Sequence, residues 1–350
     1  MANLRAKEAI DVHVGPRSFE RAGTPVLMRA VVVQRQSEPR LVLQDVPDSL
    51  AGEDECLVEV SFIGVNPGEI KDLSIYENNS RIGWDFAGTV LKPAGNGAGP
   101  QAGKRVVGTT RSGGWAENVA SPIDMVAEVP EGLELELAVC LPVPAMTAYV
   151  ALRYAGLLFG KRVLVTGAAG AVGQFACQIA LASGARVSAA VRRDDQKQLV
   201  TSHGIEDVRV TDGIAAFRDG GSFYDLILDV VGPGVGEDAA ALLDTGGVHA
   251  VVSAAGGEVL PLPILPMLSA AGQLRVVNLF ADIARGPDTG GEILSRLLAS
   301  AALGEITVPL GPIEAWESID EIVRAYLVNP HRAKPVLVVG KRQQCKDFDA

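Results

Sequence analysis

The 350-residue chain is 48% hydrophobic and 21% charged, which gives it the apolar material for a large core and, by its length, for about two domains. Its 31 basic and 42 acidic side chains leave a formal net charge of −11, and no basic tract carries interleaved aromatics, so we expect no nucleic-acid partner. No apolar run reaches the roughly 18 residues of a membrane span, and the first residues lack the apolar block of a secretory signal. We therefore expect a cytoplasmic protein without a membrane partner.

Residues 1–27 show little periodicity and are predicted to be an extension, a tag remnant or a disordered arm. A natural-looking start follows at Met28, in the strand-like "MRAVVV". From there to about residue 125, β-branched runs such as "CLVEVSFIGV", "FAGTVL" and "KRVVGTT" alternate with breaks rich in Gly and Pro. This alternation is typical of a β-rich domain.

The rhythm changes between about residues 135 and 283. Apolar runs of strand length are separated there by segments of helical length or by longer loops: "RVLVTG", "RVSAAV", "DLILDVVG", "VHAVVSAAG" and "LRVVNLF". Such alternation predicts a doubly wound parallel sheet. The tail predicts helices over residues 289–303 and 315–328 and a last strand, "KPVLVVG", after Pro330.

The run "VLVTGAAGAVGQ" indicates a nucleotide-binding turn between a strand and a helix. Ala168, Gly170 and Gly173 take the three small-residue positions of a G-x-G-x-x-G-like turn, which serve the tight turn, the approach of a pyrophosphate and close packing. The helix that follows points its free N–H groups at the phosphates. The cofactor-binding residues predicted here are Ala168, Ala169, Gly170, Ala171, Val172 and Gly173.

Two arginines, Arg192 and Arg193, stand at the end of the second strand of this unit. An acidic residue at that place accepts hydrogen bonds from the ribose hydroxyls of NAD, which an arginine cannot do. The arginines instead suit a 2′-phosphate, and Lys197 adds a third positive charge. The sequence therefore predicts NADPH as the cofactor; the alternative is a solvated loop in which the arginines offset Asp194 and Asp195.

From Met28 onward the sequence resembles the medium-chain dehydrogenase/reductases, and within them the zinc-free branch of quinone oxidoreductases and enoyl reductases. The segments that carry the resemblance are "GVNPGEIK" (64–71), "GWDFAGTV" (83–90), "AGKRVVG" (102–108), "GGWAENV" (113–119), "LPVPAMTAYVAL" (141–152), "VLVTGAAGAVG" and "AKPVLVVG". The resemblance implies an α/β fold: a GroES-like β-rich domain over 28–150 and 285–350 is interrupted by a Rossmann domain, with a doubly wound parallel sheet, over 151–284. It also implies an active site in the cleft between the domains, and a homodimer.

Zinc-binding members of that family carry a Cys near the "GVN" position and a G-H-E motif, where this chain has Asn66, Trp84 and Asp85. These three residues cannot supply the usual Cys, His and carboxylate ligands, and a four-cysteine lobe for structural zinc is absent. The four histidines lie outside the motifs and are interpreted as surface or helix-end residues: His13, His203, His249 and His331. We therefore expect no metal.

The four cysteines lie far apart and show no C-x-x-C spacing. Cys56, Cys140 and Cys177 stand in apolar stretches, and Cys345 stands near the end of the chain. This pattern predicts that the first three are packed thiols rather than disulfide partners or metal ligands.

Without a Lewis acid, hydride delivery is easiest to an activated C=C bond, whose carbonyl takes up the charge as an enolate. The resemblance of "NPGEIK" to zinc-free enoyl reductases places Asn66 and Lys71 in the cleft. Lys71 is the first candidate to orient nicotinamide or substrate, or to supply a proton, and Tyr76 is the second. An ordinary surface lysine and a packing tyrosine are the alternatives.

Three further residues are predicted beside the cofactor. Thr147, in "MTAY", is expected next to the nicotinamide, with a structural helix-start threonine as the alternative. Ser253 and Phe280, at the tips of later strands, are predicted to form part of the cofactor wall, with core packing as the alternative.

Together these residues predict an NADPH-dependent, metal-free reductase of an enone, an enoyl thioester or a quinone. Three alternatives stay open: a zinc-free ketone reductase, a nucleotide-binding protein that has a structural or partner-binding role without turnover, and a reductase of acyl groups held on an acyl carrier protein.

Overall fold

The computed structural model describes residues 26–36, 38, 40–218, 223–254, 257, 259–328 and 333–340, without the side chains of residues 236 and 237. The predicted extension therefore lies outside the described residues except for its last two, and His13, His331 and Cys345 lie outside as well. Strand β1 (Leu27–Val33) begins one residue before the predicted start and forms an antiparallel hairpin with β2 (Leu41–Pro47).

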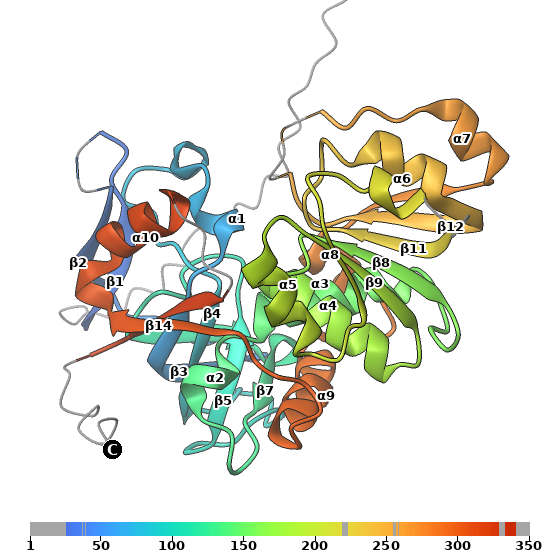
Figure 1. Ribbon diagram of the computed structural model, residues 1–350. Helices are drawn as coiled ribbons and strands as arrows, with labels where there is room; N and C mark the ends of the chain where they lie inside the picture. Colours follow the sequence, from blue (N-terminus) through green and yellow to red (C-terminus); the bar gives the residue numbers. More distant parts are fainter. Residues whose placement is uncertain are drawn as a thin grey trace, which may run out of the picture.

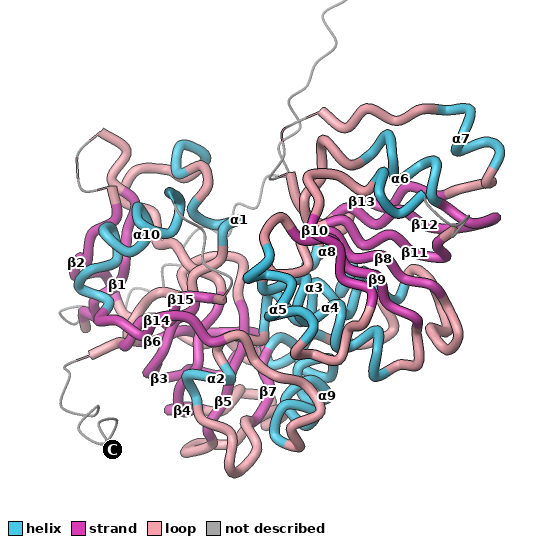
Figure 2. The backbone as a smooth tube through the Cα atoms, viewed as in Figure 1, coloured by secondary structure: helices cyan, strands magenta, loops and turns pink. Residues whose placement is uncertain are grey.

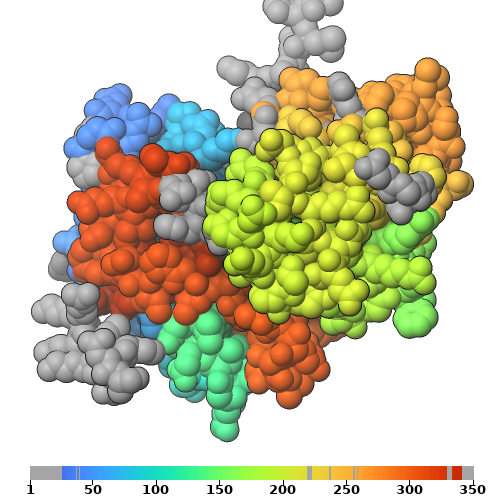
Figure 3. Space-filling model, viewed as in Figure 1, coloured from blue at the N-terminus to red at the C-terminus, as the bar shows by residue number. Residues whose placement is uncertain are grey.

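A seven-stranded sheet is built from two distant parts of the sequence. Its strands are β3 (Glu55–Gly64), β4 (Asp85–Lys92), β5 (Arg105–Thr109), β6 (Asn118–Pro122), β7 (Val126–Glu128), β14 (Leu310–Ala315) and β15 (Lys334–Val338). The order is β14-β15-β3-β4-β5-β7, with β6 paired to β3. Because β15 runs antiparallel to β3, the end of the described chain lies against its beginning (Figure 1, Figure 3).

The second sheet has six strands in the order β10-β9-β8-β11-β12-β13, and every neighbouring pair is parallel. Its strands are β8 (Arg162–Thr166), β9 (Arg186–Val191), β10 (Asp207–Val210), β11 (Tyr224–Asp229), β12 (Leu243–Val251) and β13 (Gln273–Val276). Figure 2 shows the two groups of strands on either side of α3 and α4. A doubly wound parallel sheet beside a β-rich half confirms the predicted fold class; the boundaries at 150/151 and 284/285 stay predictions.

Ten α-helices and four 3₁₀ turns belong to the described residues. The α-helices are α1 (Pro67–Ile70), α2 (Leu135–Ala138), α3 (Pro142–Arg153), α4 (Ala171–Ala182), α5 (Asp194–Thr201), α6 (Gly236–Leu242), α7 (Ile264–Ser269), α8 (Leu279–Ala284), α9 (Gly290–Ala302) and α10 (Ile319–Val328). The 3₁₀ turns are η1 (Leu73–Ile75), η2 (Ile123–Met125), η3 (Ala215–Arg218) and η4 (Trp316–Ser318). Both helices predicted in the tail are present, as α9 and α10.

Two elements of the parallel sheet differ from the prediction. The run "LRVVNLF" is a strand only as far as Val276, because the Asn278 side chain accepts a hydrogen bond from the Ala281 N–H and caps α8. Phe280 therefore lies in a helix and not at a strand tip. The short edge strand β10 was not predicted, since its four residues "DVRV" give too little pattern.

One buried apolar cluster joins the two halves. It runs from Val107 of β5 through Ala148 of α3 to Val165 of β8, so α3 packs on both sheets and fixes their mutual position. A second cluster fills the β-rich half, where α10 lies on the β1–β2 hairpin. Among the described residues no helix has the length and apolar character to cross a membrane. The cytoplasmic location stays a prediction.

Candidate functional site

The glycine turn lies between β8 and α4, at the carboxyl edge of the parallel sheet. Gly167 has φ 57°, the left-handed region that favours glycine, so the sharp turn occurs one residue before the predicted Ala168. A Cβ on Gly173 would lie 2.5 Å from the Gly167 carbonyl oxygen, so only glycine lets the helix approach the turn this closely. Gly170 is the N-cap of α4.

The predicted cofactor residues of this turn are therefore contiguous in space. Ala168 and Ala169 are buried in the turn, and Ala171, Val172 and Gly173 form the first turn of the twelve-residue helix α4. The first N–H groups of a helix have no partner within the helix and, with its dipole, favour an anion. The turn is thus suited to a pyrophosphate.

A buried network joins three strand ends beside this turn; we call it the Asp229 network and define it by Thr166, Asp229 and His249. Asp229 Oδ1 accepts hydrogen bonds from Thr166 Oγ1 at 2.7 Å, from Val231 N at 3.0 Å and from Gly232 N at 2.9 Å. Asp229 Oδ2 lies 3.0 Å from His249 Nε2. The network therefore fixes the loop after β11 against the end of β8.

Asp229 and His249 were not among the residues predicted from the sequence to form the cofactor site. The sequence did contain a signal for this pair. Asp229 ends an apolar strand and His249 lies within the apolar run "VHAVV", and polar side chains in such buried positions need polar partners. The pairing of His249 with Asp229 means that this histidine is a buried core residue, and its prediction as a surface or helix-end residue was wrong. His203, which is half-buried, lies 3.1 Å from the Gln174 side chain.

The three basic residues predicted to bind a 2′-phosphate lie together at the end of β9 and the start of α5. Arg193 Nε donates to Asp195 Oδ1 at 3.2 Å, which is the charge offset named as the alternative. The Arg192 backbone N–H donates to Gln196 Oε1, and its exposed guanidinium has no hydrogen bond or ion pair within the described part of the chain. Lys197 lines a surface depression on α5. Of the three basic side chains, those of Arg192 and Lys197 are therefore the more available to bind a phosphate.

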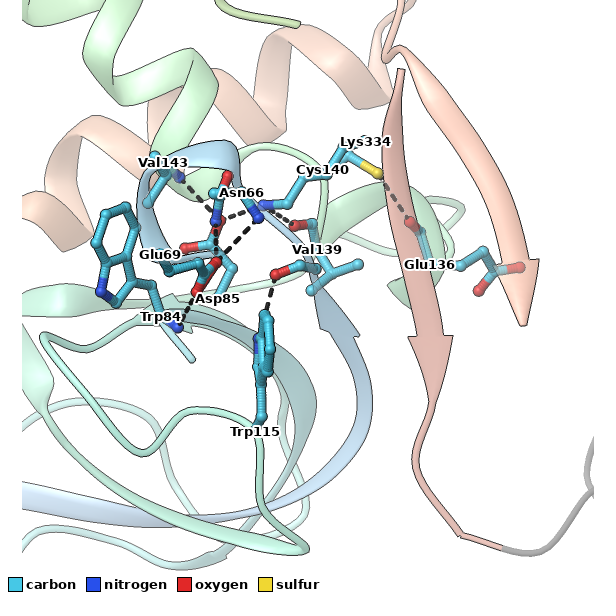
Figure 4. A network of polar contacts seen from close by, with 11 residues as sticks. Asn66, Glu69, Trp84, Asp85, Trp115, Glu136, Val139, Cys140, Val143 and Lys334 are labelled. Atoms are coloured by element: carbon cyan, nitrogen blue, oxygen red, sulfur yellow. Dashed lines mark hydrogen bonds and ion pairs between the residues drawn. The ribbon is translucent and has the colours of Figure 1, made fainter. Parts of the chain in front are cut away.

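The β-rich half contains a buried cluster of three ionisable residues, Glu69, Asp85 and Lys334, linked by the amide of Asn66; we call these four residues the acid cluster (Figure 4). Asn66 Nδ2 donates to Glu69 Oε1 at 2.8 Å and to Asp85 Oδ2 at 2.9 Å. The Lys334 ammonium donates to Asp85 Oδ2 and to the Val139 carbonyl. All four side chains are at most 4% exposed, so Asn66 is a linking residue between two carboxyl groups.

Glu69 and Lys334 were not among the predicted site residues. The Glu69 side chain also accepts from the backbone N–H groups of Asn66 and Trp84. Burial, and then the negative charge of Asp85, raise the pKa of Glu69 to about 8. One proton held by the two carboxyl groups makes the cluster neutral beside the Lys334 ammonium, which is the favoured state in a buried site.

Outside the buried apolar core, five residues form contacts between the two halves, and we call them the bridging cluster: Lys71, Trp84, Arg111, Ala254 and Phe280. The exposed Lys71 ammonium donates to the Ala254 carbonyl, in the loop after β12, at 2.8 Å. The rings of Trp84 and Phe280 pack edge to face with centroids 6.2 Å apart. The Arg111 guanidinium lies over the Phe280 ring, 4.9 Å from its centroid. Lys71 and Phe280 thus each form a contact between the two halves.

Three further predicted site residues, Tyr76, Thr147 and Ser253, lie outside the bridging cluster. Tyr76 packs against the core of the β-rich half, and burial, followed by the charge of Glu69, raises its pKa to about 12. Thr147 is buried within α3. Ser253 precedes Ala254, and its carbonyl lies so close to Gly232 that a Cβ there would collide with it. Ser253 is thus held beside the Asp229 network.

Within the described residues, no group of three or more His, Cys, Asp and Glu side chains is arranged to hold a metal ion. Cys56, Cys140 and Cys177 are buried free thiols, as predicted. Burial raises the pKa of Cys56 to about 11 and those of Cys140 and Cys177 to about 12, so all three stay protonated and unreactive at neutral pH.

Two family models match the chain: the alcohol dehydrogenase GroES-like domain over residues 52–131, and the zinc-binding dehydrogenase over residues 171–282. The quinone oxidoreductase of Pongo abelii is 34% identical over 191 residues, which are 52% of this chain and 58% of that protein. The 2-methylene-furan-3-one reductase of Solanum lycopersicum is 30% identical over 300 residues, 80% of this chain and 69% of that protein. The chain thus spans little more than half of the first relative and about two thirds of the second.

Solved structures agree in fold. The structure of mycobacterial Rv1454c complexed with NADPH is 26% identical in sequence and has a TM-score of 0.78. The match covers 89% of this chain and 100% of the Rv1454c chain. The CurK enoyl reductase has the same TM-score of 0.78 at 19% identity, covering 89% and 99% of the two chains. The second likeness shows the fold alone.

Proposed function

Since the chain belongs to the medium-chain dehydrogenase/reductase superfamily, in its quinone oxidoreductase branch, we propose that it is an NADPH-dependent, metal-free reductase. Its acceptor is the C=C bond of an enone or enoyl thioester, or a quinone. The observation that carries this proposal is the Lys71 contact to Ala254, because it holds an ammonium of the β-rich half at the strand ends of the parallel sheet. The names of the relatives, quinone oxidoreductase and 2-methylene-furan-3-one reductase, support the same acceptors.

The residues present fit a dinucleotide phosphate. Gly167 and Gly173 let α4 begin close to the end of β8, the first turn of α4 offers N–H groups, and Arg192 and Lys197 offer charged donors for a 2′-phosphate. A bound reduced nicotinamide would supply a hydride: with a proton at the α-carbon it reduces the C=C bond of an enone or enoyl thioester at the β-carbon, and with a proton on oxygen it reduces a quinone to the hydroquinone. Thr147, Ser253 and Phe280 are proposed to line the nicotinamide.

We assign Lys71 to the acceptor's carbonyl oxygen. Negative charge develops there during reduction, and a cation near it stabilises the transition state more than the ground state. Tyr76 is the weaker candidate, since a pKa of about 12 makes its hydroxyl a poor proton donor at neutral pH. Asn66 positions the two carboxyl groups of the acid cluster rather than the substrate.

The proposed independence of metal rests on the chemistry of the donors. Asp85 already accepts from the Lys334 ammonium and from Asn66, whose amide presents N–H groups to this place. A dication there would meet an ammonium and an amide donor instead of the Cys, His and carboxylate ligands that zinc requires.

The test measures NADPH oxidation by the purified full chain with matched enones, enoyl thioesters, quinones and ketones. A second assay offers the same enoyl group as a thioester on an acyl carrier protein. We expect reduction of at least one activated C=C bond or quinone, retained in chelator, with no stoichiometric zinc by elemental analysis. Ketone reduction alone would assign the ketone reductase alternative. Tight NADPH binding without oxidation by any acceptor would instead support a binding role.

We also propose a homodimer that pairs through the edge strand β13. All four residues of β13 are exposed, and exposed apolar side chains continue into the preceding segment at Val259, Ile264, Leu265 and Leu268. An exposed apolar edge strand is a template for pairing with a second chain. Light scattering should give twice the chain mass for the unmodified protein and a smaller mass for Val276→Lys; equal masses for both would exclude this surface.

A further inference from the structure

Arg111 differs from the other arginines that stack on aromatic rings. Its exposed side chain follows β5 and lies over Phe280 of the opposite half. The other stacked arginines each have a polar partner: Arg29 with Glu117 at 2.8 Å, Arg209 with Asp207 at 3.0 Å, and Arg275 with Gln273 at 3.2 Å. The Arg111 guanidinium has no hydrogen bond or ion pair within the ranges that the structure describes. Its N–H donors are thus held in place but not used.

The geometry explains how the guanidinium is held without a polar partner. Phe280 offers its face to Arg111, and Trp84 packs edge to face on Phe280. The Trp84 ring in turn lies against Gly68, where a Cβ would come within 2.9 Å of it. Stacking fixes the plane of the guanidinium and leaves its edge free, and that edge matches the two oxygens of a carboxylate or phosphate.

The charge around Arg111 makes this place unusual in an acidic protein. The chain has a formal net charge of −11, yet Arg111 has no acidic partner among the described residues. The acid on the helix of Phe280, Asp282, accepts instead from the Tyr154 hydroxyl and the Asn278 backbone N–H. The nearby carboxyl groups, Glu69 and Asp85, are buried with the Lys334 ammonium and do not neutralise Arg111. An unpaired guanidinium edge on an acidic protein is a local cation, and it selects an anion that the rest of the surface repels.

We propose that Arg111 is the specificity-determining residue for an anionic group on the substrate, a carboxylate or a phosphate, in the reductase proposed above. The inference rests on that proposed function. Lys71 then serves the carbonyl where charge develops, while Arg111 binds a charge that the substrate carries throughout. The anion belongs either to a small acceptor that bears a carboxylate or to the phosphates of a thioester carrier.

The experiment compares two substrate pairs that separate these sources. The first is 4-oxopent-2-enoate with its uncharged amide, and the second is crotonyl-coenzyme A with crotonyl-pantetheine, which lacks the phosphates. kcat/KM is measured for the unmodified protein, Arg111→Met, Arg111→Lys and Arg186→Met, the last being a control that removes one exposed arginine from the start of β9. Intrinsic reactivity cancels when each variant is compared with the unmodified protein on one substrate.

For the charged member of one pair, we expect Arg111→Met to lower kcat/KM by about 10- to 100-fold, the scale of one lost charge-assisted contact. The neutral member should change less than about twofold. Arg111→Lys should lie between, since it keeps the charge and loses the fork, and Arg186→Met should change neither. The pair that responds identifies the source of the anion.

Three results would overturn the inference. Equal losses on charged and neutral members would make Arg111 a structural contact between the halves. A larger NADPH dissociation constant in Arg111→Met, with the preference for the charged substrate intact, would assign the residue to cofactor binding. Unchanged reduction of every substrate would show that Arg111 binds no anion. By contrast, no reduction of any acceptor by the unmodified protein would contradict the proposed function itself.

Discussion

The two halves bury carboxylates in different ways. In the acid cluster, Glu69 and Asp85 lie together and are compensated by the Lys334 ammonium, which a strand from the far end of the described chain brings to them. In the Asp229 network a single carboxylate is compensated by a hydroxyl, a histidine and two backbone N–H groups. A buried charge can therefore be balanced by a second charge or by local dipoles, and only the first way depends on closing the chain.

The difference also separates the tasks of the halves. The acid cluster fixes α1 and hence the position of Lys71, which we propose acts on the acceptor. The Asp229 network fixes the loop beside the glycine turn and Ser253, which we propose lines the cofactor site. Variants of one half are therefore expected to change one task and to spare the other.

The largest effect is expected for Lys334→Met. Removing the ammonium leaves buried carboxylate charge without compensation, which costs about 3–5 kcal/mol of unfolding free energy. Lys104→Met is the matched control, since Lys104 pairs with Glu128 on the surface and should cost at most about 1 kcal/mol in urea unfolding. Adding Asp85→Asn should restore part of the loss; a Lys334→Met protein as stable as the control would refute the compensation by charge.

Next is Lys71→Met, for which we expect kcat to fall by about 10²-fold with nearly unchanged folding and NADPH affinity. Steady-state kinetics on an enone, with a separate cofactor titration, measure this. Tyr76→Phe is the companion variant and should do less. If Tyr76→Phe is slow while Lys71→Met is fast, the two roles are exchanged, and if both are fast the proton comes from water.

In the other half, Asp229→Ala should cost about 1–3 kcal/mol, since it leaves the Thr166 hydroxyl and the backbone N–H groups of Val231 and Gly232 without their acceptor. It should also weaken NADPH binding. Asp229→Asn keeps one acceptor oxygen and should cost clearly less. Equal losses in the two variants would mean that the charge itself, and not the acceptor oxygen, holds the network.

Cofactor choice should respond to Arg192 and not to the acid cluster. We expect NADPH to bind about tenfold or more tightly than NADH, and Arg192→Asp to narrow or reverse that ratio. Arg193→Ala should do less, because Arg193 is already paired with Asp195. Dissociation constants from fluorescence titration decide this, and equal affinities in the unmodified protein would remove the argument for a 2′-phosphate site.

The last prediction is a pH dependence of stability to which Glu69 of the acid cluster contributes. The folded-state pKa of Glu69 is raised from 4.5 to about 8, so its contribution to stability is complete below about pH 4.5 and is lost as the pH rises through 8. Urea midpoints between pH 5 and 8.5 should therefore fall less steeply for Glu69→Gln than for the unmodified protein. The exposed Glu59→Gln is the control, and the same slope in both variants would show that Glu69 is not the group that titrates.

The sequence by itself determined the features that depend on neighbouring residues. The glycine turn, the order of strands and helices in the parallel half and the three packed thiols follow from local spacing and hydrophobic pattern, and the family follows from the order of motifs. The prediction placed the tight turn at Ala168, one residue after its true position at Gly167, because the left-handed backbone angle is not visible in the sequence pattern. It also extended a strand to Phe280, because the cap at Asn278 is visible only as a contact.

Tertiary structure decided which side chains share a place. Lys334 meets Asp85 across 249 positions of the chain, and Arg111, Phe280 and Lys71 meet Trp84 and Ala254 only because two sheets pack on α3. His249 meets Asp229 because β11 and β12 are neighbouring parallel strands of one sheet. No local pattern encodes such encounters, since they depend on how the whole chain closes, and the energy of a charged group depends on what it meets there.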